Sequence, residues 1–263
     1  MDKLVKRINF GLIIFLIMLL PFFFLNKVYD NYFDIEYHDV LWKLSPIFIC
    51  IYIYSLLRGN IKIGIIDILI YIMIILNIIS CYYAIDRDMS IYGTDIRYEG
   101  FYSLLAYYSI FLSCKCLRGK KYVKGILLTF TFVGLFQFMY CIMQIYFKSL
   151  LHNTVWFVIS GNMANGFINN PNFTGSFVIL LLGIFVMKYL TDNKNYCLYL
   201  IISICFFINL LLCQSTGPFL GAVFMLIFAL VFLIVKKKLK ILRYMMLLLT
   251  FILCYFGVNY SYQ

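Results

Sequence analysis

The chain has 263 residues, of which 64% are hydrophobic and 13% charged, and its 22 basic and 11 acidic side chains give a formal net charge of +11. A soluble domain carries about 25% charged residues, so this composition excludes an ordinary water-soluble protein. Apolar runs of about 20 residues recur, each long enough to cross ~30 Å of hydrocarbon. The runs do not alternate in polarity as barrel strands do. We therefore predict an all-α, polytopic membrane protein.

The apolar runs predict about nine transmembrane helices in a single helical transmembrane domain, residues 1–263. The first run is too long for the apolar core of a signal peptide and lacks a small-residue cleavage site, so we expect a retained helix. In chain order, the expected helices cover residues 8–25, 43–57, 63–83, 100–114, 125–147, 173–190, 196–213, 219–235 and 241–256.

Basic residues alternate between the connections, which predicts the orientation of the chain. Of the 22 basic side chains, 17 lie in one set of connections, which includes the N-terminus. By the positive-inside rule this set is cytoplasmic, so the C-terminus is expected outside. Topology and attraction to anionic lipids account for the positive charge. Membrane lipids are therefore expected partners, and nucleic acid is not.

The nine cysteines lie mostly within or at the ends of apolar runs, where cysteine behaves as a small hydrophobic residue. Their spacing is typical of neither a disulfide framework nor a metal site. We expect no metal.

The stretch GFINNPNFTGSF, residues 166–177, concentrates hydrogen-bonding groups between two apolar runs. Asn170 is suited to cap a helix whose first residue is Pro171, where the missing N–H costs nothing. A helix N-terminus at the outer interface presents free N–H groups and a positive dipole end to an anion. The alternative is a well-capped helix without a ligand, and the residues alone leave both open.

Two further segments on the outer side carry candidate binding residues. In YGTDIRYEGFYSLL, residues 92–105, Arg97 is suited to hold a diphosphate with two hydrogen bonds, and Gly93 and Gly100 permit a tight turn and close backbone approach. The alternative for the arginine is interface snorkelling beside a neighbouring carboxylate. In CQSTGPFLGAVF, residues 213–224, the polar side chains precede a Gly-Pro turn, and an ordinary hairpin is the alternative.

In this order, the three segments resemble the glycine–Asn-Pro-Asn, Arg-x-x-Gly and Ser-Arg-Gly motifs of the O-antigen ligase and O-antigen polymerase family, over about residues 80–245. The resemblance implies a membrane glycosyltransferase of the bacterial inner or plasma membrane. Such proteins transfer a glycan from an outer-leaflet polyprenyl-diphosphate carrier to the hydroxyl of an acceptor glycan or lipid-linked sugar. It implies no metal and no cofactor.

The resemblance also implies roles for individual residues. Arg97 would be the catalytic residue that neutralises the departing diphosphate. The expected substrate-binding residues are Asn170, Asn172, Ser215 and Thr216. The expected structural residues of the motifs are Gly100, Gly166, Pro171 and Gly217.

The chain departs from the family pattern in two ways. Thr216 stands where the family has an arginine, so one expected diphosphate contact is missing. The chain also stops where the family continues into a large extracytoplasmic loop and later helices, so we expect it to correspond to the N-terminal part, and whether it is a complete enzyme stays open. The family's catalytic histidine is not assigned to His38 or His152, although both lie on the outer side.

Two other protein classes compete with a transferase, and one carboxylate inside a span is a separate functional candidate. Asp67 lies inside the third expected span, which is typical of ion or proton movement, yet Lys62 and Arg58 are expected within its reach. A transporter or flippase of lipid-linked oligosaccharide would need charged groups at the bilayer midplane, whereas polar residues gather at the outer side here. A non-catalytic membrane scaffold is the third class.

The tyrosines near the outer ends fit an interface belt or sugar stacking.

Overall fold

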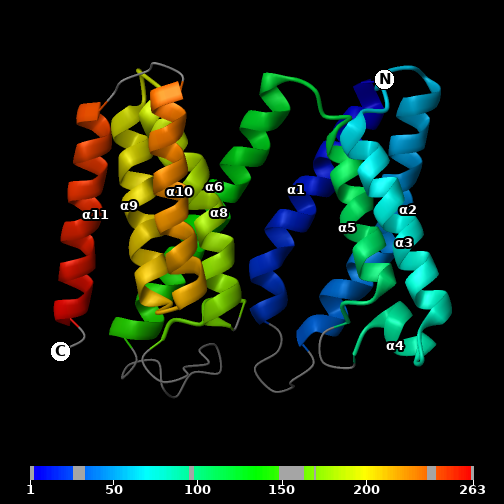
Figure 1. The fold of residues 1–263 in the computed structure, drawn as a ribbon, viewed down its shortest axis with the longest axis horizontal. Helices are drawn as coiled ribbons and strands as arrows, with labels where there is room; N and C mark the ends of the chain where they lie inside the picture. The colour runs from blue at the N-terminus through cyan, green and yellow to red at the C-terminus, as the bar shows by residue number, and fades with distance from the viewer. Residues whose placement is uncertain are drawn as a thin grey trace. The chain divides into compact units, whose positions relative to one another are not determined.

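The structure is a computed structural model that describes residues 3–25, 33–94, 98–147, 163–168, 170–235 and 241–261, except the side chains at 20–25, 33–37 and 259–261. Helices account for the regular structure of this part of the chain, which confirms the all-α class (Figure 1). The chain divides into two compact units, unit 1 with residues 1–129 and unit 2 with residues 130–263.

Six helices in the described part of the chain are long and apolar enough to cross a membrane. The protein is therefore a multi-pass membrane protein. The six segments are His38–Leu57, Ile65–Tyr83, Lys120–Tyr146, Pro171–Thr191, Thr216–Val235 and Ile241–Val258. Two shorter apolar helices, Phe101–Cys114 and Tyr196–Leu212, accompany them.

Unit 1 is built around a pair of packed helices. Its helices are α1 (Lys3–Leu25), α2 (Phe33–Leu57), α3 (Ile65–Tyr83), α4 (Arg87–Tyr92), α5 (Phe101–Cys114) and the first turns of α6 (Lys120–Tyr146). α5 packs along α2, and the buried positions of α5 carry small residues at helical spacing. These are Ser103, Ala106, Ser109 and Ser113. Small side chains let two helix backbones approach closely, so serine is used here for packing.

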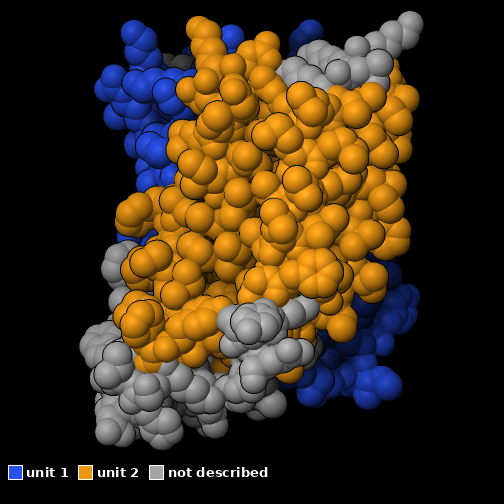
Figure 2. Space-filling model, turned by 90° about the vertical axis from the view of Figure 1, so that its left-hand side faces the viewer, with its two compact units in different colours: residues 1–129 blue, residues 130–263 orange. Residues whose placement is uncertain are grey.

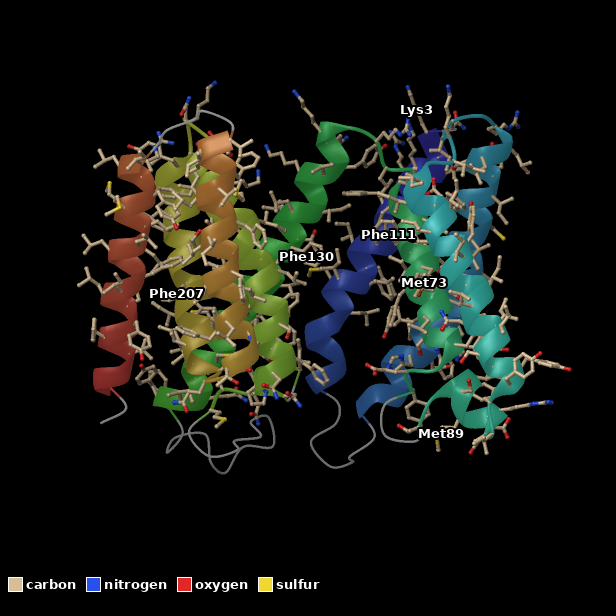
Figure 3. The ribbon with its side chains drawn as sticks, in the orientation of Figure 1. Lys3, Met73, Met89, Phe111, Phe130 and Phe207 are labelled. Atoms are coloured by element: carbon tan, nitrogen blue, oxygen red, sulfur yellow. The ribbon has the colours of Figure 1, made fainter. Side chains whose placement is uncertain are left out.

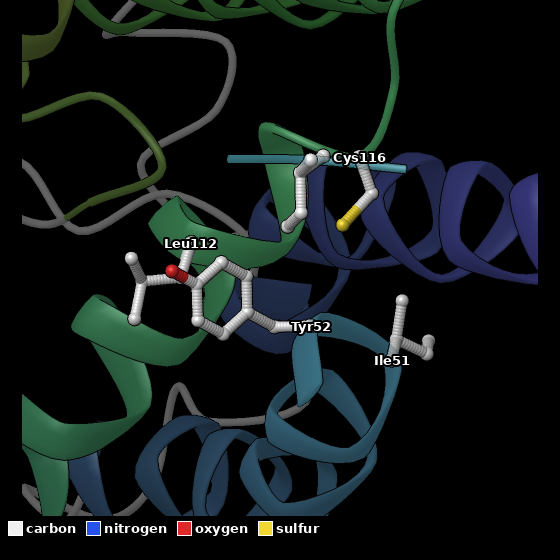
Figure 4. Close-up of a cluster of buried hydrophobic side chains, with 5 residues drawn as sticks. Ile51, Tyr52, Leu112 and Cys116 are labelled. Carbon is white, nitrogen blue, oxygen red and sulfur yellow. The ribbon is translucent and has the colours of Figure 1, made fainter. Parts of the chain in front are cut away.

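A cluster of buried side chains holds together the end of unit 1 where α2 and α5 finish. Ile51 and Tyr52 of α2 pack with Leu112 of α5 and with Cys116 just beyond it (Figure 4). Burial raises the pKa of the Cys116 thiol, so this cysteine is a neutral packing residue.

Several helices begin outside the apolar runs that predicted them. α2 starts at Phe33 and not at residue 43, and α6 starts at Lys120 and not at residue 125. The expected connection 84–99 contains the short helix α4. The apolar run marks only the part of a helix that suits hydrocarbon, while polar turns such as FDIEYHD continue the same backbone hydrogen bonding beyond it.

Unit 2 packs the rest of α6 with four helices. These are α8 (Pro171–Thr191), α9 (Tyr196–Leu212), α10 (Thr216–Val235) and α11 (Ile241–Ser261). α8 is the most buried of the six candidate spans and packs against α9 and α10. α11 packs against α9, where the rings of Phe207 and Phe251 stack at 4.1 Å; Figure 3 labels Phe207.

The outer surface of α10 and α11 is apolar, as a lipid-facing surface requires. Phe224, Phe228, Leu242 and Leu253 are among its exposed side chains, and Figure 2 views unit 2 from the side that carries α11. At one end of α11, Arg243 donates to the carbonyl oxygen of Asp192 over 2.7 Å. This bond ties the beginning of α11 to the connection between α8 and α9.

Candidate functional site

The start of α8 is a capped helix N-terminus, as the Asn-Pro-Asn sequence predicted. The side-chain oxygen of Asn170 accepts hydrogen bonds from the backbone N–H groups of Asn172 (2.9 Å) and Phe173 (3.3 Å), and Pro171 is the first helical residue. The carbonyl of Asn170 accepts the N–H of Thr174. Every N–H of the first turn therefore has a partner, and the α8 N-terminus alone retains no donor for an anion.

The residues before this helix enter the interior of unit 2. Ala164, Asn165, Gly166 and Phe167 are all buried. Two glutamines of α6 accept their backbone N–H groups: Gln144 accepts that of Gly166 (2.8 Å) and Gln137 accepts that of Phe167 (3.1 Å).

Two further bonds connect this buried segment to α8 and α9. The hydroxyl of Thr174 donates to the Asn165 carbonyl (2.6 Å), and the Ala164 N–H donates to the Leu212 carbonyl of α9 (2.9 Å). Irregular backbone is tolerated at membrane depth only when its polar groups are satisfied inside the protein. This requirement explains the density of polar side chains in this part of an apolar chain.

Gly166 occupies a position that other residues do not fit. Its φ is +63°, in the left-handed region that favours glycine. A Cβ at this position would collide with the side-chain amide of Gln137, and would lie 2.8 Å from the hydroxyl oxygen of Thr174. The glycine thus lets the segment lie directly against α6.

A hydrogen bond joins two of the three motif segments. The Ser215 hydroxyl, just before α10, donates to Oδ1 of Asn172 in the first turn of α8 over 2.6 Å. Close packing accompanies it, because a Cβ on Gly175 would lie 2.8 Å from the Pro218 ring. α8 and α10 therefore begin side by side at one end of unit 2 (Figure 1).

The start of α10 differs from that of α8 in its hydrogen bonding. Thr216 and Gly217 are exposed, and their backbone N–H groups have no partner among the described residues. The side chain of Ser215 bonds to Asn172 and does not cap this helix. Free N–H groups at the positive end of a helix dipole favour an anion.

Asn172 adds a further donor beside these groups. Its Oδ1 is occupied by Ser215, which orients its Nδ2 amide group, and this group makes no bond to a described residue. Together with the hydroxyl of Thr216, the arrangement presents neutral hydrogen-bond donors from two helices. Such a set can bind the oxygens of a phosphate group.

The Arg-x-x-Gly segment lies in unit 1, and Arg97 itself lies outside the described residues, as do Asp95 and His152. The loop that carries Arg97 is closed by two glycines. Gly93 has φ +93°, and a Cβ on it would collide with the backbone of Tyr98 and Glu99. A Cβ on Gly100 would collide with the backbone of Ile91 and Gly93. Both glycines thus permit the close backbone approach that the sequence predicted.

A polar centre with aromatic neighbours lies beside Tyr98, and the sequence did not predict it. Ser103 is fully buried in α5. Its hydroxyl accepts a hydrogen bond from the indole N–H of Trp42 over 2.9 Å and donates one to the Tyr98 carbonyl over 2.5 Å. Nδ1 of His38, a buried side chain of α2, lies 3.0 Å from the same hydroxyl oxygen. The sequence offered only the outer location of each residue, because partners 61 and 65 positions apart in the chain form no local pattern.

Asp67 is paired, but with a different residue from those expected. Its buried carboxylate forms an ion pair with Lys115, which follows α5, and accepts the Gly64 N–H over 2.5 Å. Lys115 also donates to the Lys62 carbonyl over 2.9 Å. These bonds link the start of α3 to the end of α5. A buried charge fixed between two helices is suited to structural linkage more than to ion movement.

The predicted site residues thus fall into two groups. Asn170, Pro171, Asn172, Ser215, Thr216 and Gly217 lie together at one end of unit 2, and Gly166 lies in the buried segment that leads to them. Gly100 lies in unit 1. No role was predicted for Gln137 and Gln144, although their spacing of seven residues, which places both on one helix face, was the available signal. No protein-family model, curated protein or solved structure matches the chain.

Proposed function

We propose that this protein is a bacterial membrane glycosyltransferase of the O-antigen ligase or polymerase type. It transfers a glycan from a polyprenyl-diphosphate carrier in the outer leaflet to an acceptor hydroxyl. The observation that carries the proposal is the hydrogen bond between Ser215 and Asn172, because it joins two of the motif segments on which the resemblance rests. The proposal includes about nine spans in the bacterial inner or plasma membrane, with the N-terminus inside and the C-terminus outside.

The carrier diphosphate would lie against the donors at the start of α10. Nδ2 of Asn172, the hydroxyl of Thr216 and the backbone N–H groups of Thr216 and Gly217 supply hydrogen bonds to its oxygens. In the transfer, the oxygen of the acceptor hydroxyl attacks the anomeric carbon and its proton is released to solvent. The bond from this carbon to the diphosphate oxygen breaks, and its electron pair leaves on the diphosphate. Donors that meet the departing charge stabilise the transition state. For Arg97, which lies outside the described residues, the role of neutralising the leaving diphosphate rests on the resemblance alone.

The sharpest test is Asn172→Asp, which exchanges a donor for a negative charge without changing shape. The Ser215 hydroxyl still has an oxygen to donate to, so the local fold is expected to be retained. Loss of one charge-assisted bond plus the added repulsion corresponds to about 2 kcal/mol, roughly thirtyfold in affinity. Binding of a synthetic polyprenyl-diphosphate glycan to purified protein in nanodiscs measures this change.

Two further variants complete the experiment. Ser176→Ala is the matched control one turn further along α8, because its hydroxyl bonds to the Asn172 carbonyl within the helix and it is expected to bind as wild type does. Arg97→Ala is expected to lose both binding and glycan assembly in cells at normal protein levels. Unchanged assembly in Arg97→Ala and unchanged binding in Asn172→Asp would refute the proposal and favour a membrane scaffold.

A further inference from the structure

Three aromatic side chains gather where α2, α4 and α5 meet in unit 1. Trp42 lies 6.1 Å from Tyr92 and 6.0 Å from Tyr102 between ring centroids, and the two tyrosines are 5.4 Å apart. We call these three residues the aromatic platform. Its rings are inclined to one another by 43° to 56°, so they do not cover each other face to face. Tyr92 and Tyr102 stay 46% and 41% exposed, which leaves ring surface for a ligand.

Buried hydrogen bonds fix the position of the platform's indole ring. The single hydroxyl proton of Ser103 is used toward the Tyr98 carbonyl, so the Ser103 oxygen acts as acceptor for the Trp42 N–H. Nδ1 of His38 lies 3.0 Å from the same oxygen, at hydrogen-bonding distance. Ser103 is fully buried, so the hydrogen bonds that hold the indole ring are shielded from water. A ring held in this way pays little conformational entropy when a ligand stacks on it.

The platform differs from an interface belt in the direction of the indole N–H. Belt tryptophans direct their polar group toward the headgroups and water while the ring lies in the apolar zone. The Trp42 N–H is instead turned into the protein, toward Ser103. Tyr82 and Tyr83 at the end of α3 fit the belt better, because they are 67% and 78% exposed.

We propose that the aromatic platform binds a pyranose ring of the acceptor glycan, an inference that rests on the proposed function. The C–H groups on one face of a pyranose are weakly positive and pack on the negative face of an aromatic ring. The sugar hydroxyls can form hydrogen bonds with the hydroxyls of the two tyrosines. A lipid tail would leave these groups unused.

The position of the platform in the chain supports an acceptor over other glycans. Tyr92 immediately precedes Gly93, and Tyr102 follows Gly100 by two residues, so both tyrosines flank the closed loop that carries Arg97. The resemblance gives this segment of the chain the residue that neutralises the leaving group, so we assign a sugar on its flanking tyrosines to the acceptor. The platform residues come from unit 1 alone.

The test uses Trp42 as its own reporter. The chain has two tryptophans, so Trp156→Phe leaves Trp42 as the single one. Fluorescence of this variant in nanodiscs is titrated with bacterial surface oligosaccharides that carry neither lipid nor diphosphate, chosen from those that wild-type protein captures on a printed array. We expect a saturable shift in emission, at least tenfold weaker affinity after Tyr92→Leu, and no capture after Trp42→Leu. Tyr83→Leu is the matched control, with unchanged affinity.

Three results would overturn the inference. The first is no capture of any array oligosaccharide by wild-type protein, and the second is unchanged affinity after Tyr92→Leu. The third is quenching of Trp42 by brominated phospholipid that oligosaccharide does not relieve, which would place the ring in a lipid belt. Binding of the polyprenyl-diphosphate carrier is measured in parallel and is expected to survive Trp42→Leu. If wild-type protein binds the carrier but captures no oligosaccharide, the platform is refuted and the proposed function stands.

Discussion

Single residues in this protein have sharply different tolerance for change, and the glycines show it best. Gly166 and Gly217 belong to neighbouring motif segments and both were predicted to be structural. A Cβ on Gly166 meets Gln137 and Thr174 in a left-handed backbone conformation, whereas a Cβ on Gly217 meets nothing within 4 Å. The same residue type thus serves close packing in one segment and an open helix start in the other.

We predict that Gly166→Ala destabilises the protein by roughly 3 kcal/mol, from steric overlap in a packed interior and an unfavourable φ. The melting temperature in detergent should fall by about 6 °C or more. Gly217→Ala is the control, and it should stay within about 0.5 kcal/mol of wild type because its surroundings are open. Equal melting temperatures for the two variants would contradict the packing described for the segment 163–168.

At the scale of helices, the link between α3 and α5 depends on one ion pair with unequal partners. The Asp67 side chain is 1% exposed and that of Lys115 is 28% exposed. Removal of the lysine leaves a carboxylate without its cation in the interior, while removal of the carboxylate leaves a lysine that can turn toward water. The cost of breaking the pair therefore depends on which partner is removed.

We predict that Lys115→Met destabilises the protein by about 3 to 5 kcal/mol, the range measured when one partner of a buried pair is removed. Asp67→Asn should cost less, and the double variant should recover most of the loss. Unfolding in detergent, followed by helical circular dichroism, gives the three values. A double variant as unstable as Lys115→Met alone would show that the carboxylate is not the source of the cost.

For the molecule as a whole, the proposed function depends on which ends of the helices face outward. The described structure places the candidate diphosphate donors at the start of α8 and α10, and the orientation proposed from the basic residues puts that end outside. We predict that Thr94→Cys reacts with a membrane-impermeant maleimide on intact cells and that Asn193→Cys reacts only after lysis. Both positions are exposed, so accessibility depends on the side of the membrane. The opposite pattern would reverse the topology and remove the outer-leaflet substrate.

Sequence patterns predicted the helical class and the start of α8 because both depend on local chemistry: apolar length in one case, and an Asn-Pro pair in the other. They also indicated the need for Gly93 and Gly100. They did not predict the partner of Asp67, nor that Gln137 and Gln144 satisfy the buried segment, because these contacts join residues far apart in the chain. The free donors at the start of α10 likewise follow from where the Ser215 hydroxyl points, which no local pattern encodes.

The two glutamines of α6 have a consequence for the order in which parts of the chain can insert into the membrane. The segment 163–168 cannot enter hydrocarbon by itself, because the N–H groups of Gly166 and Phe167 need Gln144 and Gln137 as acceptors. α6 precedes the segment, so the ribosome delivers the acceptors first and the segment finds them already in the bilayer. If α6 followed α11 in the chain, this segment would reach the membrane before its acceptors and would lack them during synthesis.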